Sequence, residues 1–381
     1  MLETVKLCNF KSHRSTELKF DHSRLHALVG QNSSGKTSIL QALQYLVRLG
    51  TSSFAQIFEY EQSPQFITTI GATQMSVTAS GFWGDQDRRQ DWTVSYQWKK
   101  VENPENRWLP MALWKIDEGQ EGKIEKWSSS LSEADSPIPQ VFNYPVYLKL
   151  VAANLAKPAY SDDITPKMAF DGSNFALILD YLRDETPDQF ERLQKLLKQV
   201  VPGVQKVGLR RKNVIVNRQR VINIDGKSIS YNESQDRAGK EVVLDMNTGE
   251  RIPAHAISEG TLLALGLLTV LMYPKQANLV LLDDIDQGLH PKAQRDFVKV
   301  LQTILKENPN LQIIFSTHSP YIVDELKPSQ VHVLSQINSG FSSCKRLDEH
   351  PNVEWAQQTL TTGEFWDAEG EDWVVAGEMH G

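Results

Sequence analysis

Cysteine is scarce in this 381-residue chain, which contains only Cys8 and Cys344. Two cysteines cannot form the disulfide framework that stabilises small secreted domains. Long apolar runs are also lacking, because the longest, from Leu262 to Tyr273, is well short of the roughly 20 residues that a membrane-spanning helix needs. The N-terminus has no signal-peptide pattern of basic, apolar and small residues. We therefore expect a cytoplasmic protein that does not bind membranes.

An excess of basic charge is absent as well, since 40 Lys and Arg residues stand against 47 Asp and Glu residues, for a net charge of −7. This balance argues against nucleic-acid binding by the whole surface, although a local basic face could bind it. In the range 206–227 the single acid is Asp225 and the basic residues are Lys206, Arg210, Arg211, Lys212, Arg218, Arg220 and Lys227. Nucleic acid is thus a candidate partner of this run, with a solvated β face as the equal alternative.

The most informative motif is the run GQNSSGKTS at residues 30–38. The pattern G-x-x-x-x-G-K-[ST] is typical of a phosphate-binding loop, in which backbone N–H groups and a lysine hold the phosphates and a hydroxyl ligates Mg²⁺. Residues 25–29 predict a buried strand before the loop, and the apolar stripe of residues 39–47 predicts a helix after it. We therefore expect ATP and Mg²⁺ to bind through Gly30, Asn32, Ser33, Gly35, Lys36, Thr37 and Ser38.

Two buried strands in the second half end in residues that could reach a bound nucleotide. Residues 279–282 form an apolar run followed by Asp283 and Asp284, and residues 313–315 form another that leads to His318. The carboxyl ends of parallel strands meet at one edge of a sheet, where α/β proteins bind ligands. We therefore expect the two acids and the histidine to lie at the edge where the phosphate loop begins.

The remaining elements are expected from periodicity. Antiparallel strands are predicted at residues 4–8 with 16–20 and at 75–82 with 92–98, and residues 101–140 read as loops with one hairpin near 111–116. Helices are predicted within 173–200, where Thr186 begins a capping box with Pro187 at the first helical position. Val204 to Lys227 has β character. Sustained heptads are absent, which excludes a long coiled-coil arm.

In their order along the chain, these motifs resemble the ATP-binding-cassette ATPases of the RecF, SMC and OLD (overcoming lysogenization defect) group. The resemblance is closest to stand-alone members of prokaryotic antiviral systems, and it covers residues 1–50 and 250–335. It implies an α/β fold, an ABC-type P-loop ATPase head with a mixed sheet, an antiparallel β subdomain and a short helical insertion. The ATPase domain would span residues 1–340, with its core in 1–50 and 250–340 and the insertion in 51–249, followed by an acidic and aromatic segment at 341–381.

The resemblance also implies roles for the residues at the strand ends. Asp283 matches the Walker B aspartate that holds Mg²⁺ together with Thr37. Asp284 stands where the family has a catalytic glutamate that orients the attacking water, so slow hydrolysis of ATP to ADP and phosphate is expected. His318 matches the switch histidine that contacts the γ-phosphate. The glutamine of the family's Q-loop stays open between Gln62, Gln65 and Gln74.

Residues 258–261 resemble the signature motif of these ATPases, which implies an oligomer. The N-cap serine, Ser258, precedes an apolar helix at residues 262–272. We expect Gly260, which lies between the serine and this helix, to leave the start of the helix open to approach. In the family, this helix closes the ATP site of another subunit. Ser258 and Gly260 are therefore expected to contact ATP held by the partner's Lys36 and Thr37, in a homodimer or a higher homo-oligomer.

The preferred function is an ATPase that serves as the sensor or scaffold subunit of an antiviral defence complex. OLD nucleases carry a TOPRIM domain after the ATPase, but too few residues follow His318 for one here, so the effector would be a separate nuclease or other toxin. The C-terminal Phe365, Trp366 and Trp373 are expected to dock on a partner rather than fold back on the ATPase. The alternatives are a RecF-like DNA repair or recombination ATPase and a scaffold that binds ATP without hydrolysing it.

Overall fold

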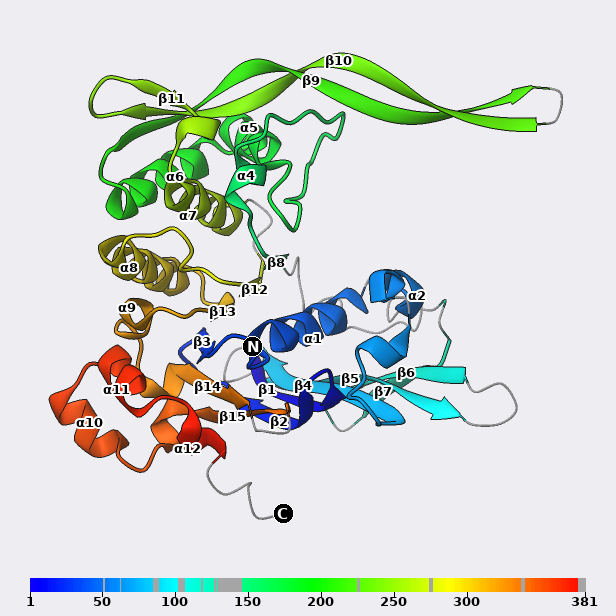
Figure 1. Ribbon diagram of the computed structural model, residues 1–381, viewed down its shortest axis with the longest axis vertical. Coiled ribbons are helices and arrows are strands. Elements are labelled where there is room, and N and C mark those ends of the chain that lie inside the picture. The colour runs from blue at the N-terminus through cyan, green and yellow to red at the C-terminus, as the bar shows by residue number, and fades with distance from the viewer. Residues whose placement is uncertain are drawn as a thin grey trace. The chain divides into compact units, whose positions relative to one another are not determined.

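The computed structural model describes residues 1–375 except for 51, 62, 85–88, 102–106, 118, 127, 129–145, 225–226, 274–276 and 337–339. It is an α/β structure that divides into two compact units, drawn in Figure 1. The first comprises Met1–Tyr147, Gln276–Asp286 and Leu301–Gly381, and the second comprises Leu148–Lys275 and Gln287–Val300. Across the described residues, no helix has the length and apolarity that crossing a membrane would require.

One sheet of the first unit is antiparallel and contains the predicted N-terminal pair. Its strand order is β2-β1-β4-β5-β6-β7. The strands are β1 (Leu2–Phe10), β2 (His13–Lys19), β4 (Gln74–Trp83), β5 (Gln90–Val101), β6 (Arg107–Ile116) and β7 (Gln120–Ile124). The hairpin of β6 and β7 confirms the one predicted near residues 111–116. This sheet therefore supplies the antiparallel β subdomain of the predicted fold.

The other sheet of the first unit is mixed and carries the strands that lead to the functional motifs. Its order is β15-β14-β3-β13-β12-β8. The strands are β3 (Leu25–Gly30), β8 (Val146–Leu148), β12 (Leu279–Leu282), β13 (Gln312–Ser316), β14 (Val331–Gln336) and β15 (Ser342–Arg346). Strands β14, β3, β13 and β12 are parallel, whereas β15 is antiparallel to β14. The phosphate loop, the paired acids and the histidine thus follow three neighbouring parallel strands.

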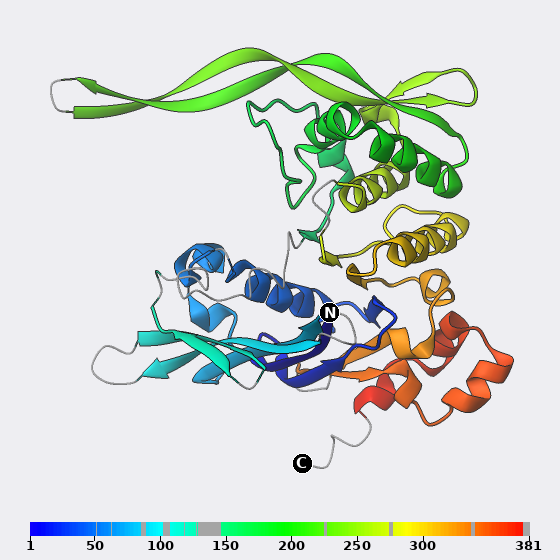
Figure 2. The ribbon, with the colours of Figure 1, turned by 180° about the vertical axis from the view of Figure 1, so that it is seen from behind.

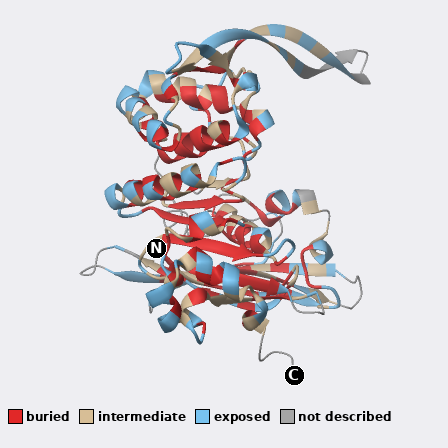
Figure 3. Cartoon of the chain, turned by 60° about the vertical axis from the view of Figure 1, so that its left-hand side comes forward, coloured by how far each residue is buried: buried red, intermediate tan, exposed pale blue. Residues whose placement is uncertain are grey.

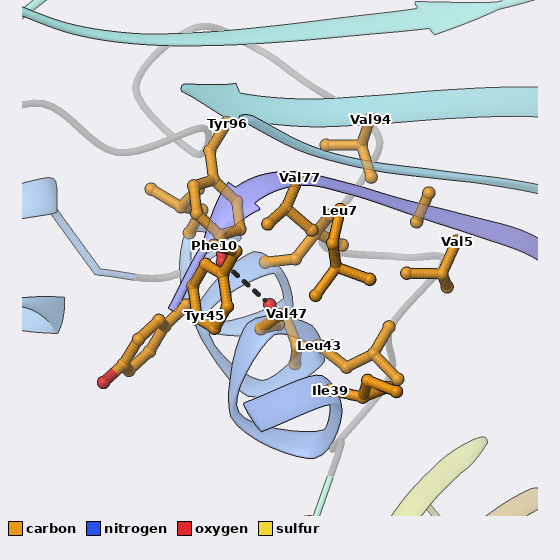
Figure 4. Close-up of a cluster of buried hydrophobic side chains, with 14 of the residues drawn as sticks. Val5, Leu7, Phe10, Ile39, Leu43, Tyr45, Val47, Val77, Val94 and Tyr96 are labelled. Atoms are coloured by element: carbon orange, nitrogen blue, oxygen red, sulfur yellow. Dashed lines mark hydrogen bonds between the residues drawn. The ribbon is translucent and has the colours of Figure 1, made fainter. Parts of the chain in front are cut away.

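Helix α1 (Lys36–Arg48) packs against strands of both sheets. Its buried stripe includes Ile39 and Leu43, which lie against Val5 and Leu7 of β1 in Figure 4. The Tyr96 hydroxyl donates a 3.1 Å hydrogen bond to the Ala42 carbonyl. Spacing of apolar residues by three and four positions explains why this segment is a helix with one buried face. The packing fixes the helix whose first residues belong to the phosphate loop.

The second unit combines helices with a three-stranded sheet of order β11-β10-β9. Its elements are α4 (Ala152–Leu155), α5 (Phe175–Glu185), α6 (Pro187–Val200), α7 (Glu259–Leu271), β9 (Val204–Ile224), β10 (Lys227–Met246) and β11 (Arg251–Pro253). The boundary between the units falls within α8 (Pro291–Glu307). Pro187 begins α6 as predicted, but the capping box is wrong, because the Thr186 hydroxyl donates to the Leu182 carbonyl instead.

Strands β9 and β10 form a long two-stranded ribbon, visible from behind in Figure 2. The pairing runs in register from Ile224 opposite Lys227 to Lys206 opposite Asp245. Much of the ribbon is exposed, as Figure 3 shows, and Ile215 is 68% exposed. The sequence predicted β structure for 204–227 but missed the pairing strand, because residues 232–241 contain no apolar residue larger than alanine and show no alternation.

The C-terminal part of the chain packs within the first unit. It contains α10 (Val353–Thr359), α11 (Thr362–Glu369) and α12 (Asp372–Val375), and α11 contacts α9 (Pro320–Val323). Phe365 is 2% exposed and Trp366 is 7% exposed. The expectation that these aromatic side chains dock on a partner is therefore wrong for Phe365 and Trp366, since they bury their surface within this chain. The first unit also contains the short helix α2 (Phe54–Ile57), which follows α1 in the sequence.

Candidate nucleotide site

The phosphate loop adopts backbone conformations that require glycine. Gly30 has a φ of 137° and Gly35 a φ of 101°, values that side chains with a Cβ atom rarely adopt. A Cβ atom on Gly30 would also lie 2.2 Å from the Leu334 carbonyl oxygen of β14. The two glycines therefore allow the chain to turn tightly between β3 and α1. Asn32 and Ser33 are exposed in this turn, and Ser38 is half-buried in the first turn of α1.

The Lys36 ammonium lies inside the loop. Nζ donates hydrogen bonds of 2.8 Å to the carbonyl oxygens of Gly30 and Gln31, and the residue is only 5% exposed. Burial lowers the pKa of Lys36, while the carboxylates of Asp284 and Asp283 raise it. The loop thus holds a cation where the pattern predicts contact with the outer phosphates.

Thr37 and Asp283 lie side by side, as the Mg²⁺ assignment requires. The Thr37 hydroxyl is 3.0 Å and 3.2 Å from the two carboxylate oxygens of Asp283. Asp283 is 6% exposed. A hydroxyl and a carboxylate are hard oxygen ligands of the kind that Mg²⁺ prefers. The pair, next to a buried lysine on a glycine-lined loop, fits a magnesium nucleotide.

Ser316 connects the paired acids and was missed by the sequence analysis. Its hydroxyl donates to Asp283 Oδ1 at 2.5 Å and accepts the backbone N–H of Asp284 at 2.8 Å. Asp284 has a φ of 56°, a left-handed conformation that is uncommon outside glycine. The hydrogen bond from its N–H holds this conformation. The only sequence signal was that Ser316 is the first polar residue after an apolar run.

His318 is exposed, and Asp286 holds the backbone beside it. Oδ1 of Asp286 accepts hydrogen bonds from the Thr317 hydroxyl at 2.7 Å and from the His318 N–H at 3.2 Å. Because β12 and β13 pair directly, these residues and Asp284 follow neighbouring strand ends. The structure therefore brings the predicted acids and the histidine to one sheet edge and adds Asp286 to them.

Ser258 and Gly260 begin α7 in the second unit. The Ser258 side chain is exposed and accepts the Thr261 N–H at 3.4 Å, as an N-cap does. Gly260 is buried, and a Cβ atom on it would lie 2.1 Å from the Gly288 carbonyl oxygen. The expectation that this glycine leaves the helix end open is wrong at Gly260, which is covered by the same chain. Ser258 and Glu259 remain exposed at the helix start.

Two of the three Q-loop candidates lie in the segments that the structure describes. Gln62 lies outside the described residues, whereas Gln65 and Gln74 are both exposed. Gln74 lines a cavity on the antiparallel sheet together with Cys8 and Asn9. In the part of the chain that the structure describes, no three His, Cys, Asp or Glu residues are arranged to hold a metal ion by themselves.

The chain is similar in sequence to several proteins that are named as ATPases or phosphatases. The retron Vc95 probable ATPase of Vibrio cholerae is 23% identical over 89% of this chain and 74% of its own length. An ATP/GTP phosphatase of Helicobacter pylori is 21% identical over 86% of this chain and 87% of its own. A Rad50 double-strand break repair ATPase of Methanococcus maripaludis is 32% identical, but over only 16% of this chain and 8% of its own length.

A solved structure and two family models identify the fold and the family of the chain. The SMC head bound to the C-winged helix domain of ScpA aligns with a TM-score of 0.56 and 16% identity, over 90% of this chain and 96% of that one. A model described as "AAA ATPase domain" matches residues 1–104. A model described as "AAA domain, putative AbiEii toxin, Type IV TA system" matches residues 80–324, more than half of the chain. The chain therefore belongs to this AAA family and has the fold of an SMC-type ATPase head.

Proposed function

We propose that this ATPase binds ATP with Mg²⁺ on residues 30–38 and hydrolyses it slowly. The observation that carries the proposal is the cluster of Lys36, Thr37 and Asp283, in which a buried ammonium, a hydroxyl and a carboxylate surround the start of α1. The first N–H groups of a helix are unpaired and favour anions. Lys36 adds a positive charge at the same place.

We assign one role to each residue that lies at the start of α1 or at the neighbouring strand ends. Thr37 and Asp283 would hold Mg²⁺, which supplies charge neutralisation on the phosphate oxygens when bound. Asp284 orients the attacking water, and its carboxylate is shorter by one methylene than the glutamate of the resembling ATPases. Ser316 fixes the Asp284 backbone, and Asp286 fixes that of His318, so that His318 can sense the γ-phosphate.

Replacing Asp284 tests the hydrolytic role. Asp284→Asn keeps the size and removes the charge that polarises water, so turnover should fall by about 100-fold or more. ATP affinity, measured by calorimetric titration, should stay within a few fold of the wild type. Equal turnover in the variant would reject the role of Asp284. If the wild type itself releases no phosphate but binds ATP, the protein is the non-hydrolysing scaffold.

We also propose that ATP joins two copies through the start of α7. The exposed Ser258 hydroxyl and the first amides of this 13-residue helix would contact ATP held by Lys36 of the partner copy. Because Gly260 packs on Gly288, replacing Gly260 with a larger residue would damage the fold and would not test the interface.

Ser258→Asp is the sharper test of this interface. Aspartate keeps the N-cap, but its charge would repel the partner's γ-phosphate. Sedimentation should show association of the wild type with ATP, loss of association in Ser258→Asp, and no loss in the neighbouring Glu259→Gln. Association that is independent of ATP, or unchanged in Ser258→Asp, would contradict the proposal.

The biological role that we propose is a sensor or scaffold of antiviral defence that acts with a separate effector, a nuclease or other toxin. The similarity to a retron ATPase supports this role. The description of the matching AAA family, which names a putative toxin of a type IV toxin-antitoxin system, also supports it. Cells expressing the chain with its neighbouring genes should survive phage infection better than cells carrying Lys36→Ala in the same context. Equal survival of the two would contradict the role.

Nucleic acid remains a candidate partner of residues 206–227. Acidic residues of β10 offset part of the positive charge of this run. Lys206 lies opposite Asp245, and the Arg210 guanidinium is 2.6 Å from the buried Glu241 carboxylate. Arg211 and Lys212 are exposed and are the residues to test. Charge reversal at both should weaken DNA or RNA binding and reduce its salt dependence. Unaltered binding would return the run to a solvated face.

A further inference from the structure

We propose that His13 is a positioning residue of the nucleotide site, which holds the Gly35–Lys36 peptide of the phosphate loop in the orientation that receives phosphate. His13 begins β2 and is fully buried, with 0% exposure. Its Nε2 atom is 3.1 Å from the Gly35 carbonyl oxygen. The inference rests on the proposed ATP site, because it assigns a support to that site.

The tautomer of His13 follows from its partners. A carbonyl oxygen only accepts, so Nε2 carries the proton and donates to Gly35. Nδ1 lies 2.9 Å from the Thr16 hydroxyl, which donates to it when the ring is neutral. Burial lowers the pKa of His13 to about 4, which keeps the ring neutral at pH 7. The ring is therefore a directed donor with both nitrogens engaged.

The donor acts on the peptide that faces the phosphates. The Gly35 carbonyl also accepts the Ile39 N–H at 3.1 Å, so two donors fix its direction. In a trans peptide the C=O and the following N–H point to opposite sides. Fixing the Gly35 carbonyl toward His13 therefore directs the Lys36 N–H away from His13, out of the first turn of α1. That amide is one of the unpaired donors with which a helix start binds phosphate.

Thr16 contacts the His13 ring, and Ser12 and Ser342 fix the turn that precedes it. The Ser342 N–H donates to the Ser12 carbonyl at 2.8 Å, and the two serine hydroxyls are 2.7 Å apart. Thr16 Oγ1 lies 3.4 Å from the Ser342 carbonyl and 2.9 Å from the His13 ring. Strand β15 thus closes over the turn between β1 and β2, directly behind the phosphate loop.

The absence of a side chain on Gly35 completes the fit. A Cβ atom there would lie 2.5 Å from His13 Nε2 and 2.8 Å from the Ser342 hydroxyl. Glycine at this position is therefore required by the close approach of the imidazole as well as by its positive φ. The imidazole therefore packs directly against the glycine and leaves no room for a side chain at position 35.

Two substitutions at His13 separate the donor from the shape of the ring. His13→Phe fills the space without a donor, whereas His13→Gln places an amide N–H near the position of Nε2. We expect calorimetric titration with Mg·ATP to show about tenfold or more loss of affinity in His13→Phe, because each tenfold step corresponds to a hydrogen-bond-sized free energy. Affinity in His13→Gln should recover to within about threefold of the wild type.

His26→Phe is the matched control, because it replaces another fully buried histidine, whose Nε2 atom lies 3.7 Å from Asp21 Oδ1 rather than against the Gly35 carbonyl. It should leave ATP affinity unchanged. Wild-type affinity in a folded His13→Phe variant would overturn the proposal, as would equal losses in His13→Phe and His13→Gln. If His13→Phe does not fold, Thr16→Val replaces it and should weaken ATP binding by freeing the ring; unchanged affinity there would also overturn it. Failure of the wild type to bind ATP would instead overturn the proposed function.

Discussion

The side-chain amide of Gln31 donates a 3.3 Å hydrogen bond to the carboxylate of Glu371, 340 residues further along the chain. Gln31 belongs to the phosphate loop, and Glu371 lies just before α12. The Glu371 carboxylate is also close enough to Lys36 to raise the pKa of its ammonium. A C-terminal acid therefore faces the place where the phosphates of ATP would lie.

We expect Glu371→Gln to raise ATP affinity, because removing this negative charge removes repulsion of the triphosphate. The gain should be a few fold at low salt and should shrink at high salt, as exposed charges are screened. Titration of Mg·ATP at two salt concentrations measures it. Glu354→Gln, which neutralises an exposed acid of α10, is the control and should change nothing. Unchanged or lower affinity in Glu371→Gln would contradict the expectation.

Lengthening Asp284 should raise turnover. Asp284→Glu restores the carboxylate length of the resembling ATPases, so we expect several-fold faster phosphate release at saturating ATP, measured with a coupled assay. Adding Lys36→Ala to the same variant should remove the activity and thereby exclude a contaminant. Slower release in Asp284→Glu would mean that Ser316 and the left-handed Asp284 backbone set the water position for the shorter carboxylate.

Acid should destabilise the protein before its carboxylates titrate. Burial lowers the pKa of His13 and His26 from 6.5 to about 4. Between these pH values the unfolded chain binds more protons, so the free energy of unfolding falls as pH decreases. The loss should be roughly 2 kcal/mol per histidine from pH 7 to pH 5. Urea denaturation at both pH values measures it, and His26→Phe should lose its share; equal stability at pH 7 and pH 5 would refute the prediction.

The C-terminal helices should contribute to stability. Phe365→Ala empties a site that is 2% exposed, and such changes cost about 3–5 kcal/mol in other cores. Trp355→Ala removes a side chain that is 58% exposed and should cost far less. Urea denaturation distinguishes the two. Similar midpoints for Phe365→Ala and the wild type would show that α11 is not part of the folded unit.

The parts of the fold with strong periodicity could be predicted from the sequence. Strands 279–282 and 313–315 are short apolar runs, and their ends had to meet at one edge once they were parallel. Thr37 and Asp283 were predicted to share Mg²⁺, and their side chains lie 3.0 Å apart. The residue pattern of a phosphate loop specifies both the backbone conformation of the loop and the position of its lysine. This part of the site could therefore be predicted from the sequence.

Contacts between distant residues could not be predicted. Glu371 and Gln31 meet through the packing of α11 and α12, which no local pattern encodes. Ser316 and His13 are single polar residues in or beside strands, and their roles depend on which carbonyl or amide the fold brings to them. Strand β10 was missed because its polar residues gain their structure from pairing with β9, rather than from burial on one face.

Calorimetric titration of the full chain with Mg·ATP, compared with Lys36→Ala, tests the central claim most directly. The Lys36 ammonium carries the positive charge of the loop and holds the Gly30 and Gln31 carbonyls, so its loss removes both the charge and the support. The wild type should bind ATP with heat that Lys36→Ala no longer shows, while circular dichroism finds both folded. Equal affinities of the two folded proteins would contradict the assignment of this loop as the ATP site.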